Sequence, residues 1–144
     1  MRTKYDEIEG VTWYSDKSSP KFANANSFHI YFGKKKGESP WLRLKVQYSA
    51  DDWLFIRAFT LVVDGRKFEK SPAKFERDHD GEIWEWYDEG LSSSDLEMIK
   101  AIITSKKSTI RFAGDKYYND RTISTAEKKA LQSVLDAYSV LGGT

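Results

Sequence analysis

Alternating apolar and polar residues are the sequence feature that most restricts the fold of this chain. Between Trp41 and Tyr48, the apolar side chains occupy every second position: Leu42, Leu44, Val46 and Tyr48. The same two-residue period recurs over residues 28–32. This period places the apolar side chains on one face of a β-strand and does not fit the 3.6-residue repeat of a helix. The first ninety residues are therefore predicted to form mostly antiparallel strands, each with one buried and one polar face.

Three short glycine-containing pairs predict where these strands turn. Asp-Gly and Gly-Asp pairs reach the positive φ angles that two-residue hairpin turns need. They occur at residues 64–65, 80–81 and 114–115. Across the first and third turns, the predicted partners are Leu61 with Phe68 and Phe112 with Tyr117.

The turn at Asp80-Gly81 decides which face of the aromatic segment GEIWEWYDEG, residues 81–90, is buried. A two-residue turn places Arg77 opposite Trp84. The predicted inner face then comprises Phe75, Arg77, Trp84 and Trp86, and we interpret the two indoles as core anchors. Glu76 would lie opposite Glu85, a like-charge pair that requires water. The outer side is the candidate interaction face: Glu76, Asp78, Glu85 and Tyr87.

Two alternative functions for the same segment follow from its composition. An exposed row of Trp84, Trp86 and Tyr87 would be a platform for carbohydrate. Paired carboxylates beside aromatic side chains are also typical of polysaccharide-cleaving enzymes, and the candidates here are Glu82, Glu85, Asp88 and Glu89.

Helical signals appear only in the last third of the chain. Ser94 and Glu97 have the spacing of a capping box and precede apolar residues at helical spacing, which predicts a helix near residues 94–106. Ser124 and Glu127 repeat the device before a second predicted helix near 125–141. The expected fold is a single α+β domain over residues 1–144, with about seven or eight mostly antiparallel strands in a twisted sheet or open sandwich and two helices packed on it.

Composition narrows the function classes. The 23 basic and 22 acidic residues give a formal net charge of +1, so nucleic acid is not expected as a partner. The absence of cysteine excludes disulfides and thiolate chemistry. No segment is apolar enough to span a bilayer. The chain is expected to be soluble, with a cytoplasmic location and an exported, anchored one both left open.

Catalytic, cofactor and metal sites are not expected from the motifs. The only histidines, His29 and His79, are interpreted as surface residues, the first on the polar face of a strand and the second beside a turn. Residues 76–81 begin like a calcium-binding loop, but Tyr87 stands where the closing glutamate should be. A weaker calcium site of another type and a plain hairpin turn both stay open for this segment.

One polar strand face combines basic and aromatic residues. It would carry His29, Tyr31, Arg43, Lys45 and Gln47 if their two strands were neighbours. The near-neutral net charge argues against strong nucleic-acid binding, and a polar outer sheet face explains the same pattern.

The stretches GVTWY, SADDWLFI and IWEWYD, with the tail IRFAGDKYYNDRTISTAEKKALQSVLDAY, resemble an uncharacterised bacterial domain family of unknown function. The resemblance runs from Val11 to Tyr138. It implies a small bacterial module that can occur in lipoprotein-like or mobile-element proteins, and it brings no catalytic residues with it. The favoured hypothesis is therefore a non-catalytic binding or interaction module whose partner is protein or carbohydrate.

Overall fold

Ten strands and two helices make up the structure, a computed structural model that describes residues 1–144. Every strand pair is antiparallel. The predicted α+β class is confirmed, but the strands outnumber the seven or eight expected and divide between two sheets. Neither helix is both long and apolar enough to cross a membrane.

The larger sheet has six strands in the order β1-β2-β3-β4-β8-β7. Their bounds are Arg2–Asp6 (β1), Val11–Ser15 (β2), Ser27–Lys35 (β3), Trp41–Ala50 (β4), Glu76–Asp80 (β7) and Glu82–Gly90 (β8). The smaller sheet has four strands in the order β10-β9-β5-β6. Their bounds are Ala58–Val63 (β5), Arg66–Lys70 (β6), Ser108–Ala113 (β9) and Tyr118–Thr122 (β10).

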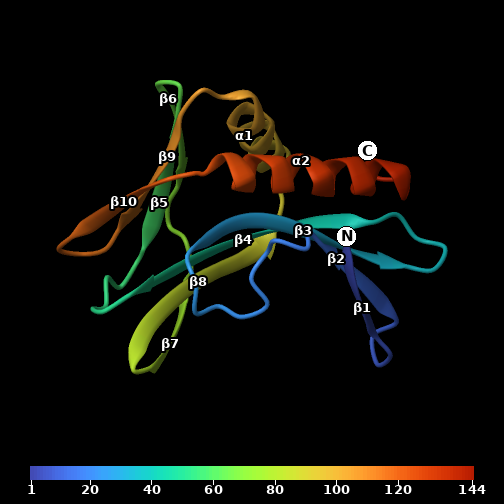
Figure 1. Ribbon diagram of the computed structural model, residues 1–144, viewed down its shortest axis with the longest axis horizontal. Coiled ribbons are helices and arrows are strands. Elements are labelled where there is room, and N and C mark those ends of the chain that lie inside the picture. Colours follow the sequence, from blue (N-terminus) through green and yellow to red (C-terminus); the bar gives the residue numbers. More distant parts are fainter.

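Helix α1 spans Ser93–Thr104 and helix α2 spans Thr125–Val140. Figure 1 shows α2 lying along one face of the six-stranded sheet. The four-stranded sheet lies beyond the N-terminal end of this helix. Ser124 and Glu127 cap α2 as predicted. The capping box of α1 is formed by Ser92 and Asp95, so the predicted pair Ser94 and Glu97 is wrong by two residues.

A single cluster of 24 buried hydrophobic residues joins both sheets and both helices. The alternation that predicted β4 is confirmed, because its even-numbered apolar residues lie in this core: Leu42, Leu44, Val46 and Tyr48. The opposite face of the six-stranded sheet is turned away from the helices (Figure 1), and we call it the open face.

The three hairpins differ in how far their registers follow the turn signals. Leu61 pairs with Phe68 as predicted, because Asp64 and Gly65 both take positive φ angles, 47° and 87°. The register predicted at residues 114–115 is wrong by two residues: Phe112 pairs with Asn119.

Gly114 was interpreted as a turn residue, but it is needed because the backbone of Leu54 passes close to it. A Cβ on Gly114 would collide with the backbone carbonyl of Leu54, so this position needs glycine for packing. The connection between β9 and β10 is consequently a four-residue one, residues 114–117.

The register predicted at Asp80-Gly81 is wrong by one residue. Asp80 pairs directly with Glu82, which leaves Gly81 alone in the turn, and Arg77 lies opposite Glu85. A one-residue shift moves every side chain of a strand to the other face. Tyr87 and Glu85 are therefore buried, whereas Trp84 and Trp86 lie on the open face and are half-buried.

Candidate functional site

The open face carries the basic and aromatic side chains that the sequence placed together. Within the six-stranded sheet, Tyr31 lies opposite Arg43, and His29 lies opposite Lys45. Gln47 follows on the same face, opposite Ser27. The prediction that these residues share one face is confirmed.

Part of the open face is covered by residues 16–26, the loop between β2 and β3. Figure 1 shows this loop on the side of the sheet away from α2. The side-chain amide of Gln47 donates to the carbonyl oxygens of Phe22 and Ala25 at 3.1 and 3.0 Å. From β1, the Arg2 guanidinium donates to the carbonyls of Lys17 and Ser19 at 2.9 and 2.8 Å. Two side chains from different strands thus hold the loop backbone in place.

A pocket of about 730 Å³ lies between this loop, β1 and the sheet. Its floor includes Trp13, His29 and Tyr31, and its walls include residues 2–4 and 19–22. This volume lies within the range of small-molecule sites in proteins, roughly 300 to 1,000 Å³. We call it the loop pocket.

All charged side chains that line the loop pocket are basic. Its basic lining residues are Arg2, Lys4, Lys21 and Lys45, and none of its lining residues carries a carboxylate. Lys4 and Lys21 are exposed, and Lys45 is half-buried. The pocket therefore favours an anionic occupant.

One carboxylate contacts Tyr31 of the pocket floor and is already paired with a cation. Asp88 accepts hydrogen bonds from the Tyr31 hydroxyl at 2.7 and 2.6 Å and from Nε of Arg43 at 2.9 Å. Burial and the hydrogen bond to Asp88 raise the pKa of Tyr31 above its usual value. The phenol is consequently a fixed, neutral part of the pocket floor.

His29 is buried, so its interpretation as a surface histidine is wrong. The loop covers the polar strand face on which it lies, and only 7% of the residue is exposed. Its Nδ1 lies 2.7 Å from the hydroxyl oxygen of Ser27. Burial, helped by the charge of Lys45, lowers the pKa of His29 to about 4. At neutral pH the pocket therefore contains an uncharged imidazole.

This burial predicts a pH-dependent stability. As pH falls below 6.5, the unfolded chain takes up a proton on His29 before the folded protein does, so stability present above pH 6.5 is lost toward pH 4. We expect a loss of about 2 kcal/mol at pH 5 relative to pH 7. Denaturant unfolding at both pH values measures it. His29→Gln should remove this part of the slope and the exposed-site control His79→Gln should keep it; equal slopes in all three proteins would contradict the prediction.

The loop pocket also contains a buried polar atom without a partner. Ser19 is 6% exposed and lines the pocket, and its hydroxyl makes no hydrogen bond within the protein. Buried hydroxyls are normally satisfied, and leaving one unpaired costs about 1 to 3 kcal/mol.

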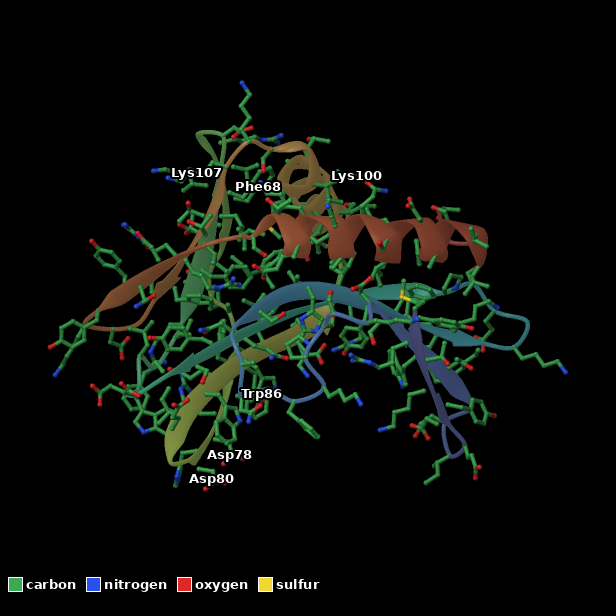
Figure 2. The ribbon with its side chains drawn as sticks, in the orientation of Figure 1. Phe68, Asp78, Asp80, Trp86, Lys100 and Lys107 are labelled. Carbon is green, nitrogen blue, oxygen red and sulfur yellow. The ribbon has the colours of Figure 1, made fainter.

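The four residues predicted to form the candidate interaction face do not lie on one face of the sheet. Glu76 and Asp78 are exposed on β7, whereas Glu85 and Tyr87 point into the core, 0% and 4% exposed. In Figure 2, Trp86 projects away from the helices, and Asp78 and Asp80 lie toward the tip of the β7–β8 hairpin. Tyr87 cannot complete the proposed aromatic platform, which leaves Trp84 and Trp86 on the open face.

The carboxylates proposed for polysaccharide cleavage do not form a pair. Glu85 accepts three backbone hydrogen bonds and one from Arg77, and Asp88 is held by Arg43 and Tyr31. Glu82 and Glu89 lie seven residues apart on one strand, a separation of about 23 Å, well beyond the 5 to 10 Å that such catalysis uses. No group of three or more acidic or histidine side chains is placed to hold a metal ion, residues 76–81 included.

Several residues of the loop pocket were missed by sequence reasoning: Trp13, Ser19, Lys21 and Phe22. The available signal was the mixed basic and aromatic face of β3 and β4, but nothing local in residues 16–26 indicates that the loop folds back over it. No protein-family model, curated protein or solved structure matches the chain. The resemblance to a bacterial domain family stays a prediction.

Proposed function

We propose that this protein is a non-catalytic binding module that takes an anionic ligand in the loop pocket. The observation that carries the proposal is the lining itself, with four basic side chains and no carboxylate. Favourable interaction with several cationic groups at once gives an anion both affinity and orientation.

The titratable groups of the pocket support binding over catalysis. General acids and bases work best when their pKa lies near the operating pH. The pKa of His29 is about 4, and that of Tyr31 is raised above its ordinary value, so neither matches neutral pH. The groups on the pocket floor are suited to recognition through neutral hydrogen bonds.

A pair of double variants tests the proposal by calorimetric titration with sodium tripolyphosphate. Lys4→Gln/Lys21→Gln removes two exposed charges from the pocket, and we expect affinity to fall about tenfold, corresponding to about 1.4 kcal/mol. Lys36→Gln/Lys116→Gln removes two exposed lysines elsewhere and matches the change in net charge. Equal loss of affinity in both double variants would show that the anion follows net charge and not the pocket.

A second candidate, carbohydrate binding, is favoured by one observation. Trp84 and Trp86 alternate along β8 on the open face and are half-buried, so part of each indole is accessible. Quenching or enhancement of tryptophan fluorescence by neutral oligosaccharides, lost in Trp86→Ala, would favour this function over the anion-binding one.

A further inference from the structure

Aromatic side chains line the same pocket as the basic ones. Trp13 from β2 forms part of the floor, and Phe22 from the loop forms part of the wall. Phe22 is 73% exposed, so a bound ligand could reach its ring. The two rings come from separate elements and meet at one site.

The ring of Trp13 is held in place by neighbouring aromatic rings. It packs at 5.5 Å from the ring of Tyr31 and at 5.7 Å, edge-on, from Trp41. Gly33 makes this packing possible, because a Cβ there would lie 2.6 Å from Trp41 and 2.9 Å from Trp13. A rigid aromatic surface loses little entropy when a planar group binds against it.

Cations beside an aromatic surface match the chemistry of a nucleotide. Lysine ammonium groups bind phosphate oxygens, and nucleobases stack on aromatic side chains. The neutral His29 ring lines the same pocket and supplies a hydrogen-bonding group for a polar edge of a base or ribose.

Charge on the rest of the sheet limits the length of the ligand. Beyond β4 lie β8 and β7, whose exposed carboxylates include Glu76, Asp78, Asp80 and Glu82. A nucleic-acid strand that continued across the open face would bring its phosphates toward these groups. This arrangement favours a single nucleotide over a polymer, in keeping with the expectation that nucleic acid is not a partner.

We infer that the ligand of the loop pocket is a free nucleoside phosphate, with its phosphate held by Lys4, Lys21 and Lys45 and its base against Trp13 and Phe22. This inference rests on the proposed function, since it names the class of anion that the pocket takes.

Calorimetric titration of the full chain with AMP, GMP, CMP and UMP tests the inference, with ribose 5-phosphate as the ligand that lacks a base. At least one nucleotide should bind about tenfold tighter than ribose 5-phosphate, since base stacking adds to the phosphate contacts. If ribose 5-phosphate binds as tightly as every nucleotide, the inference fails and anion binding stands. If neither these compounds nor tripolyphosphate bind, both fail.

Two exposed aromatic residues provide matched variants. Phe22→Ala should weaken nucleotide binding about fivefold or more and leave ribose 5-phosphate unchanged. Tyr117→Ala is the control, because Tyr117 is 72% exposed and lies on the connection between β9 and β10. An unchanged nucleotide affinity in Phe22→Ala would overturn the inferred contact. A ten-nucleotide single strand should bind no more than tenfold tighter than the best nucleotide, and a larger gain would identify a polymer as the ligand.

Discussion

Replacing Glu85 by glutamine is expected to lower the free energy of unfolding by about 3 kcal/mol or more. The Glu85 side chain is fully buried and accepts backbone hydrogen bonds from three successive residues, Leu54, Phe55 and Ile56, at 2.9, 3.1 and 2.8 Å. Arg77 donates a fourth at 2.9 Å. A glutamine amide would turn an NH₂ group toward donors and remove the charge that Arg77 pairs with.

The carboxylate also holds an unusual backbone conformation. Phe55 has φ 55°, in the left-handed region that non-glycine residues seldom occupy. Three N–H groups that converge on one anion compensate for this conformation. Losing the carboxylate should therefore release the segment as well as weaken the hydrogen bonds.

Equilibrium denaturation of Glu85→Gln, with Glu82→Gln as control, measures this effect. Glu82 is exposed at the start of the same strand, so its variant should stay within about 0.5 kcal/mol of the wild type. The sequence-derived register placed Glu85 outside, opposite Glu76, and implied a neutral or stabilising substitution. A neutral result would support that register and contradict the structure.

Phe112→Ala is expected to cost about 3 to 5 kcal/mol, because it would open a cavity where the two sheets meet. Phe112 is fully buried on β9 of the smaller sheet. Its ring lies 5.2 Å from that of Tyr48 on β4 of the larger sheet and 6.4 Å from that of Phe75.

The number of unfolding transitions distinguishes a core shared by both sheets from two sheets that are loosely joined. Thermal and denaturant unfolding should both show a single transition that moves to lower stability in Phe112→Ala. The exposed Tyr117→Ala variant should leave the transition in place. A variant in which only part of the signal shifts would show that the two sheets unfold separately.

Patterns that depend on neighbouring residues were predicted well from the sequence. The alternation in β4, the Asp64-Gly65 turn and the Ser124 cap each need only a few consecutive residues to act. The capping box of α1 was placed two residues late although it is a local pattern; the other errors arose where contacts between residues distant in sequence decide the structure. Gly114 fits against the Leu54 carbonyl, and the register at Gly81 places Glu85 within reach of the backbone of residues 54–56.

The loop pocket could not be predicted for the same reason. His29 lies on a polar strand face and would be exposed on the sheet alone. It is buried because Gln47 and Arg2 bind carbonyl groups of a loop that joins β2 to β3. The basic residues of the pocket come from β1, β4 and the loop, so no single segment of the sequence is rich enough in charge to indicate an anion site.

Mapping of amide chemical shifts during a titration with sodium tripolyphosphate shows directly whether the anion binds in the loop pocket. We expect the largest changes in residues 2–4 and 19–22 and around Lys45, and we expect them to saturate together with one dissociation constant. Changes centred on Trp84 and Trp86, or spread evenly over the exposed lysines, would contradict this expectation.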